Sequence, residues 1–305
     1  MREQAGLVVS THGRHCMVED PTGSTVLCHA RGKKLTAVVG DRVRWLASHD
    51  SGVITEVLPR RNLLRRQDHN RSKLFAANLD QVLIMLAAQP VFSELLLARM
   101  LIACEAERIA VHVVLNKADL QPEFEAAWQR LAPYRRMGYT VLPLTAADDQ
   151  KDGSLTTVEP LLTGRASLLV GPSGVGKSTL INRLVPGANI RTAAISQALQ
   201  SGRHTTTRTN WYWLNRSDGS AIIDSPGFQE FGLQHLDQRQ LVHCMPDLAL
   251  HTAQCRFANC THMHEPGCQL RSAVDDAQAG ISQARYDIYR RLWLELTPAA
   301  HRGRF

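Results

Sequence analysis

The sequence predicts a multidomain α/β protein built from three parts: an N-terminal β-barrel, a central α/β domain and a C-terminal helical domain. Three observations carry this prediction. Short β-branched runs separated by glycine turns fill the first part, strand and helix patterns alternate through the middle, and three cysteines crowd together near the end. We expect the parts to span residues 1–62, 63–228 and 229–305.

The first part contains short runs that are typical of strands. They are rich in β-branched residues and are bounded by Gly, Pro and Asp. The runs are Gly6–Ser10, Ser24–His29, Val43–Leu46 and Gly52–Leu58. Strands at this spacing favour a small barrel of the OB type, a fold that binds oligonucleotides. The same pattern suits an SH3-like barrel, so both folds remain open at this point.

Positive charge is concentrated at the start of the chain. Residues 1–73 hold thirteen Lys and Arg against seven Asp and Glu, which is +6 of the total formal charge of +7. This asymmetry favours a polyanionic partner such as RNA, and the alternative is a solvated basic surface. Arg31, Lys33 and Lys34 are expected in a loop between strands, and a basic linker is expected over residues 60–73.

A phosphate-binding loop lies between an apolar strand pattern at Ala166–Val170 and a helical pattern that starts near Thr179. It fits G-x-x-x-x-G-K-[ST] at every fixed position, and its glycines let successive backbone N–H groups face an anion. Lys177 is expected to reach the β and γ phosphates, and Ser178 to hold Mg²⁺. The predicted phosphate-binding residues are Gly171, Pro172, Ser173, Gly174, Val175, Gly176, Lys177, Ser178 and Thr179.

A second motif selects the base. Asn116, Lys117, Ala118 and Asp119 follow the buried-strand pattern at residues 111–115. An Asp carboxylate can accept hydrogen bonds from N1–H and the exocyclic amine of guanine, whereas adenine lacks that pair of donors. Asn116 can bond the base edge, and the stem of Lys117 can cover the ring. The sequence therefore predicts guanine nucleotide rather than adenine nucleotide.

The two motifs stand in reversed order, because this guanine motif precedes the phosphate-binding loop. The order indicates a circularly permuted P-loop GTPase domain. With its flanking features, the chain resembles the RsgA (YjeQ) family of ribosome-assembly GTPases over essentially its whole length. The resemblance implies an OB-fold barrel, Mg²⁺ with GTP, and binding to the small ribosomal subunit and its rRNA late in assembly, with hydrolysis stimulated by the subunit.

Further nucleotide-binding residues follow from GTPase motifs and the resemblance. Thr145 and Ala146 stand where GTPases often have a Ser-Ala pair that contacts guanine. A switch I segment is expected at residues 202–208, where Thr205, Thr206 and Thr207 are alternative sensors of Mg²⁺ and the γ-phosphate.

A D-x-x-G element completes the predicted site. In it, Asp224 is expected to hold Mg²⁺ through water and the Gly227 N–H to meet the γ-phosphate. Phe228 stands where many GTPases carry a water-orienting Gln. His204 is the candidate catalytic residue in its place, because an imidazole can accept a proton from water near neutral pH. The alternative for His204 is a solvated loop histidine.

The C-terminal part carries a candidate metal site. Cys255, Cys260, His262 and Cys268 supply three thiolates and one imidazole, which is a full tetrahedral set for one structural Zn²⁺. Their spacing matches the RsgA motif, and His264 is a rival ligand. Two other histidines and Cys244 near the cluster, and Cys16, Cys28 and Cys104 elsewhere, are expected to be ordinary residues of the core or surface.

The last predicted element is an amphipathic helix over Ile281–Leu296. Its Arg285, Arg290 and Arg291 are expected on a solvated face, and the alternative is a contact with rRNA. No membrane span and no signal peptide are expected. The protein is expected to be a monomer in the cytoplasm. Two rival functions remain open. A metal-delivery GTPase would use the Cys/His cluster for its cargo, and an RNA-binding scaffold would hold GTP without turning it over.

Overall fold

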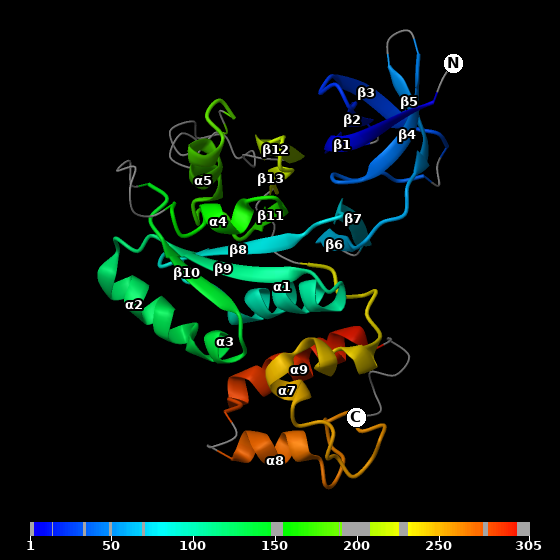
Figure 1. Cartoon of the computed structure of the whole chain (residues 1–305). Helices are drawn as coiled ribbons and strands as arrows, with labels where there is room; N and C mark the ends of the chain where they lie inside the picture. Colours follow the sequence, from blue (N-terminus) through cyan, green and yellow to red (C-terminus); the bar gives the residue numbers. More distant parts are fainter. Residues whose placement is uncertain are drawn as a thin grey trace.

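The computed structural model describes residues 3–13, 15–32, 35–48, 51–68, 71–147, 155–188, 190, 208–225, 231–276 and 280–297 (Figure 1). A β-barrel at the N-terminal end, a central α/β domain and a helical tail follow one another along the chain. Figure 1 shows the tail beneath helix α1 and the barrel at the opposite end of the molecule. No helix among the described residues is long and apolar enough to cross a membrane.

The barrel has five strands. They are β1 (Gln4–His12), β2 (His15–Glu19), β3 (Thr25–Ala30), β4 (Arg42–Ala47) and β5 (Gly52–Val57). Strand β1 pairs with both β2 and β4, and β3 pairs with β5, which closes the barrel around Val8, Cys28 and Trp45. Strand β2 was not among the predicted runs, because its alternating sequence HCMVE carries only one β-branched residue.

The segment expected as a basic linker is a β-hairpin instead. Strands β6 (Leu63–Asp68) and β7 (Arg71–Ala77) pair antiparallel. The hairpin has buried anchors in Leu64 and Phe75, which pack into the core of the central domain. At its barrel end, a Cβ on Gly40 would lie 2.1 Å from the Ala77 carbonyl oxygen, so barrel and hairpin backbones meet in close contact.

The central sheet runs in the order β10-β9-β8-β11-β13-β12. Its strands are β8 (Gln81–Ala87), β9 (Ala110–Asn116), β10 (Thr140–Leu144), β11 (Ala166–Val170), β12 (Thr209–Asn215) and β13 (Ser220–Asp224). All neighbours are parallel except β12, which pairs antiparallel with β13. Strand β8, the centre of the sheet, is buried along its whole length, as the apolar run QVLIMLA requires.

Helices cover both faces of this sheet (Figure 1). Helices α1 (Glu94–Ala106), α2 (Gln121–Arg130) and α3 (Ala132–Arg136) lie on one face, and α4 (Glu159–Leu162) and α5 (Lys177–Leu184) lie on the other. Ser93 caps α1 by accepting from the Leu96 N–H. Helices α2 and α3 follow each other directly and are two helices, because Pro133 stands in the first turn of the second.

Barrel and central domain share one sheet. Strand β1 pairs with β12 at Ser10 and Asn210, and the Ser10 Oγ donates to Asn210 Oδ1 at 2.7 Å. A buried carboxylate holds the same boundary: Glu19 accepts from Arg216 at 2.5 and 2.9 Å and from Trp213 Nε1 at 3.0 Å. These contacts fix the barrel against the strand that follows the switch I segment.

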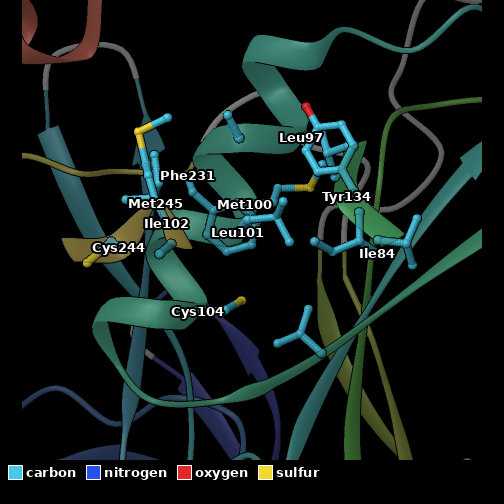
Figure 2. Packing of buried hydrophobic residues seen from close by; sticks show 14 of the residues in the cluster. Ile84, Leu97, Met100, Leu101, Ile102, Cys104, Tyr134, Phe231, Cys244 and Met245 are labelled. Atoms are coloured by element: carbon cyan, nitrogen blue, oxygen red, sulfur yellow. The ribbon is translucent and has the colours of Figure 1, made fainter. Parts of the chain in front are cut away.

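The tail packs against α1. It contains the short turns η1 (Gln238–Gln240) and η2 (Val242–Cys244) and helices α7 (Pro246–Ala249), α8 (Gln269–Asp275) and α9 (Gln283–Leu296). Figure 2 shows Phe231, Cys244 and Met245 of the tail beside Ile102, while Leu97 and Tyr134 lie at the other end of α1. Both groups belong to one buried cluster, so tail and central domain share a core.

Helix α9 corrects one expectation. Arg285 was expected on a solvated face, but it is 5% exposed and pairs with Asp247 at 2.8 and 2.9 Å. Tyr286, Tyr289 and Trp293 are buried on the same helix as Arg285, whereas Ala284 is exposed. The predicted amphipathic helix is otherwise confirmed, since Ile281 and Leu292 are buried and Ile288 and Leu296 pack against the same cluster.

Candidate functional site

The phosphate-binding loop connects β11 to α5 at the carboxyl end of the parallel strands. Gly171, Gly174 and Gly176 have φ values of 152°, 79° and 104°, in the region that favours glycine. Space also demands glycine at two of these positions. A Cβ on Gly171 would lie 2.1 Å from the Met85 carbonyl oxygen, and one on Gly176 would lie 2.3 Å from Asn116 Nδ2. The loop is therefore pressed against the neighbouring strands β8 and β9.

Asn116 joins the phosphate-binding loop to the guanine motif. Its Nδ2 donates to the Val175 carbonyl at 2.7 Å, and its Oδ1 accepts from the Ala146 N–H at 2.8 Å. Both bonds are buried, and Asn116 itself is 3% exposed. One amide hydrogen remains available for a base. The sequence-based interpretation gave Asn116 a base contact and missed its role as the bridge between three loops.

Lys177 and Asp224 form the charged centre of the site. The Lys177 ammonium donates to the carbonyls of Gly171 and Pro172 at 2.8 and 2.7 Å, and burial lowers its pKa to about 8. Burial raises the pKa of Asp224 to about 6, and the nearby Lys177 opposes that shift. The Lys177 ammonium is thus held on two carbonyls of the loop that the sequence predicts to bind phosphate.

The chemistry of this donor set fits Mg²⁺. Asp224 is 2% exposed, and its Oδ2 has no hydrogen-bond partner among the described residues. Buried carboxylate oxygens are rarely left without a partner, and hard cations prefer oxygen ligands. Ser178, next to Lys177 in the first turn of α5, carries a hydroxyl, which is also an oxygen ligand. Ser225 fixes the end of β13, because its Oγ donates to the Leu169 carbonyl at 2.7 Å.

The guanine motif forms a turn after β9. Lys117 has φ 65°, and its Nζ donates to the Gln89 carbonyl at 2.5 Å. The Ala118 N–H bonds the Leu144 carbonyl at 3.1 Å, which places Thr145 and Ala146 beside the motif. Asp119 is exposed at the edge of this turn, so its carboxylate can face a base.

Several predicted residues lie outside the described residues. They are the switch I residues His204, Thr205, Thr206 and Thr207, and Gly227 with Phe228 of the D-x-x-G element. The structure describes the strands that lead out of switch I and into the D-x-x-G element, β12 and β13 respectively. Asn210 and Asp224 are register partners on these two strands.

The four predicted zinc ligands come together in the tail. The ligand atoms of Cys255, Cys260, His262 and Cys268 all lie within 4.8 Å of one another. His262 Nδ1 lies 3.5 Å from both Cys255 Sγ and Cys268 Sγ. Zn–S and Zn–N bond lengths with tetrahedral angles require S···N separations of about 3.5 Å, so the set fits zinc. The rival His264 is exposed and is not part of this group.

Glu265 organises the metal loop and was missed by the sequence interpretation. Its carboxylate accepts from the Thr261 N–H at 2.8 Å, from the Thr261 hydroxyl at 2.5 Å and from the Met263 N–H at 3.2 Å. Burial alone would raise the pKa of Glu265, but these hydrogen bonds outweigh it and lower the pKa to about 2. The available signal was a carboxylate that stands directly before Pro-Gly and three to five residues from Cys260, His262 and Cys268.

Helix α9 holds the loop from the other side. The hydroxyls of Tyr286 and Tyr289 donate to the carbonyls of His262 and Thr261, each at 2.7 Å. His262 is 5% exposed and has φ 60°, so its backbone is held in an unusual conformation by these contacts. The metal loop is thus a packed part of the tail.

Comparison with known proteins decides the family. The family profile described as RsgA GTPase matches residues 57–234. A small ribosomal subunit biogenesis GTPase RsgA of Variovorax paradoxus is 57% identical over 299 residues, which cover 97% of this chain and 93% of the relative. The chain belongs to the RsgA GTPase family. A Burkholderia pseudomallei RsgA protein is 50% identical and covers 94% of this chain and 90% of its own length.

Solved structures agree with the RsgA assignment. YjeQ from Thermotoga maritima is similar with a TM-score of 0.72 and 29% identity, covering 97% of this chain and 99% of its own. YloQ, described as a circularly permuted GTPase, has a TM-score of 0.67 and 26% identity, with 97% of both chains covered. The fold prediction of a barrel, a circularly permuted GTPase domain and a tail with a Cys/His cluster is therefore confirmed.

Proposed function

We propose that this protein hydrolyses GTP to GDP and phosphate and acts in the maturation of the small ribosomal subunit, as the names of its relatives state for them. The observation that carries the nucleotide part is the Asn116 bridge. It holds the phosphate-binding loop, the N-K-x-D motif and the Thr145–Ala146 loop in one constellation. Family membership makes the chain a GTPase, and the bridge accounts for how its permuted halves make one site.

In the proposed complex, the residues of 171–179 enclose the phosphates with their backbone N–H groups. Lys177 moves from its two carbonyl partners to the β and γ phosphates, and Asp119 accepts from the guanine edge. Ser178 and Asp224 would hold Mg²⁺, which supplies charge neutralisation on the phosphates. One of Thr205, Thr206 and Thr207 closes over the γ-phosphate, and the Gly227 N–H meets it from the opposite side.

His204 is proposed to orient the attacking water. The support is chemical: Phe228 has no polar group with which to orient water, and switch I carries an imidazole. Hydrolysis is then slow until a partner positions switch I. The strand that follows switch I in the sequence is β12, which bonds the barrel through Asn210, so a partner on the barrel is linked to the strand that begins five residues after His204.

The metal is proposed to be one structural Zn²⁺. Four protein ligands leave no open position, and Tyr286, Tyr289 and Glu265 fasten the loop that carries them. A cargo site of a metal-delivery protein would need ligands that can open. The packed geometry therefore favours the structural role over the rival function.

The partners proposed are GTP and GDP, the small ribosomal subunit and its rRNA. The basic first 73 residues support an RNA contact, with the barrel of residues 1–62 facing rRNA, the GTPase domain at 63–228 and the zinc domain at 229–305. The protein is proposed to act in the cytoplasm as a monomer. Co-sedimentation with purified small subunits tests this function. A non-hydrolysable GTP analogue should support binding and GDP should weaken it, whereas equal absence of binding with both nucleotides would contradict it.

A further inference from the structure

Three polar residues stand in one row across the boundary between the barrel and the central domain. Ser10 on β1 is the register partner of Asn210 on β12, and Asn210 is the register partner of Asp224 on β13. Directly opposite residues of antiparallel strands share a face of the sheet and stand about 5 Å apart at Cβ. Figure 1 shows these three strands where the barrel meets the central sheet. Asn210 therefore lies between a residue of the barrel and the carboxylate proposed to hold Mg²⁺.

A β-bulge in β1 aims Ser10 at β12. The register partner of Val8 on β2 is Val18, and that of Ser10 is the adjacent Met17. Because adjacent residues of a strand point to opposite faces, Ser10 faces away from the barrel core in which Val8 is buried. In a regular strand Ser10 would share the face of Val8, which stands two positions before it. Bulges re-aim side chains in this way and are common next to active sites.

The hydrogen bond from Ser10 orients the amide of Asn210. Ser10 Oγ donates to Asn210 Oδ1 at 2.7 Å. With the amide oxygen bonded to the barrel, the amide nitrogen is left to donate to groups of the central domain. Asparagine is depleted in strands, so strand formation does not explain a half-buried asparagine in β12. A polar contact of its side chain does.

Tyr212 lies at the same place. It follows Asn210 by two positions on β12, so the two side chains share a face. Burial, and after it the charge of Asp224, raises the pKa of Tyr212, and a hydrogen bond with the Asn210 side chain opposes that shift. The Asn210 amide, the Tyr212 hydroxyl and the Asp224 carboxylate are therefore neighbours at the edge of the proposed cation site.

One oxygen of the Asp224 carboxylate has room for a further bond. Its Oδ2 is buried and has no hydrogen-bond partner among the described residues, and the Lys177 ammonium donates to loop carbonyls. A single water can bridge an amide N–H and a carboxylate that are in register without a direct bond. Asn210 is a neutral donor, so such a bridge holds Asp224 without neutralising the charge that a cation needs.

Contacts near both ends of β12 hold the strand against the barrel. At its start, residues 209 and 210 pair with β1. Toward its other end, Trp213 and the following Arg216 donate to the buried carboxylate of Glu19. A strand held near both ends keeps its register, so Asn210 stays fixed relative to Ser10 as long as the barrel stays in place.

We propose that Asn210 is a positioning residue of the Mg²⁺ site and that Ser10 of the barrel sets its orientation. The Asn210 amide holds Asp224 through one water and keeps the carboxylate in the orientation that binds the cation. The barrel thereby contributes to the affinity for nucleotide with Mg²⁺. The inference goes beyond the proposed function and rests on it in one respect, which is that Asp224 is a Mg²⁺ ligand.

Calorimetry of GDP binding to the full chain, in Mg²⁺ and in EDTA, tests this role. In Asn210→Ala, the gain in affinity that Mg²⁺ gives should fall by roughly twofold to tenfold, the range for one hydrogen bond, while the affinity in EDTA stays that of wild type. Ser10→Ala should lower the gain in the same direction. The double variant should lose no more than Asn210→Ala alone, because both residues act through one amide. Ser10→Thr keeps the hydroxyl and should keep the gain.

Thr55→Ala is the matched control, because the Thr55 hydroxyl bonds Glu3 and Arg44 within the barrel. A full Mg²⁺ gain in Asn210→Ala, or equal losses in Mg²⁺ and in EDTA, would overturn the positioning role. A full gain in Ser10→Ala would overturn the role given to the barrel.

Asp224→Asn separates this inference from the proposed function. It should abolish the Mg²⁺ gain, and a full gain in that variant would contradict the proposed ligand and the positioning role with it. Loss of the gain in Asp224→Asn together with a full gain in Asn210→Ala would refute the positioning role alone.

Discussion

Asn116 and Gly176 are in contact across the nucleotide site. A Cβ added to Gly176 would lie 2.3 Å from Asn116 Nδ2, the atom that donates to the Val175 carbonyl at 2.7 Å. In this permuted chain the guanine motif precedes the phosphate-binding loop by more than fifty positions. The contact is therefore the place where the two halves of the site are held together. A side chain introduced at position 176 would test whether the two halves are coupled.

Gly176→Ala should weaken GTP and GDP binding together. The added methyl group displaces the Asn116 amide, which leaves the buried Val175 carbonyl and Ala146 N–H without partners at a cost of about 1–3 kcal/mol each. We expect at least a tenfold loss of affinity by calorimetry. Gly187→Ala is the matched control, because Gly187 has a similar φ of 98° but no atom within 4 Å of its added Cβ. Equal losses in both variants would show that backbone strain, and not the bridge, is responsible.

Base selection should depend on Asp119. Asp119→Asn replaces an acceptor of two guanine hydrogen bonds with a group that can donate, so GTP should bind at least tenfold more weakly and xanthosine triphosphate should bind better. Competition binding with the two nucleotides measures the change. A variant that keeps the GTP preference of wild type would remove Asp119 from the base site.

The Mg²⁺ dependence of nucleotide binding should vary with pH around 6. Burial raises the pKa of Asp224 to about 6, so the carboxylate is protonated below that pH and ionised above it. A cation requires the ionised form, which means that Mg²⁺-dependent GDP affinity should rise from pH 5 to pH 7 and then level off, by about tenfold per pH unit well below the pKa. In Asp224→Asn the dependence in this window should vanish. An unchanged pH profile in that variant would place the titrating group elsewhere.

Zinc should be needed for the fold of the tail. Cys260→Ala should lose the metal and the hydrogen-exchange protection of α9, because the loop carbonyls that Tyr286 and Tyr289 bond would no longer be fixed. The control is Cys244→Ala, a buried tail cysteine outside the ligand set. Elemental analysis follows the metal. One full equivalent of zinc in Cys260→Ala would rule out the ligand set.

The sequence predicted the fold where patterns are strong and local. Strand β11 lies at the predicted residues, because a buried apolar run is readable without tertiary information. The hairpin β6–β7 was predicted as a linker. Its strands are stabilised by pairing with each other and by burial of Leu64 and Phe75 in a core that the local sequence does not reveal.

The functional site was likewise predicted where the sequence signal is local and missed where it depends on distant segments. Motif spacing located the residues around Lys177, Asn116 and the zinc cluster, since each motif is contiguous or nearly so. The partners that hold them come from distant segments. Glu19 meets Arg216 across 197 positions, and Arg285 meets Asp247 from another helix. A buried carboxylate with a distant arginine partner has no periodic signature, so Glu19 and Asp247 were indistinguishable from solvated charges in the sequence.

Single-turnover GTP hydrolysis with and without purified small ribosomal subunits tests the central claim most directly. Wild type should hydrolyse GTP slowly alone and at least tenfold faster with subunits, because Phe228 cannot orient water and the partner must position switch I. His204→Ala should bind GTP as wild type does but lose most of the acceleration. No acceleration of wild type would contradict the proposed function, and full acceleration of His204→Ala would contradict the role given to His204.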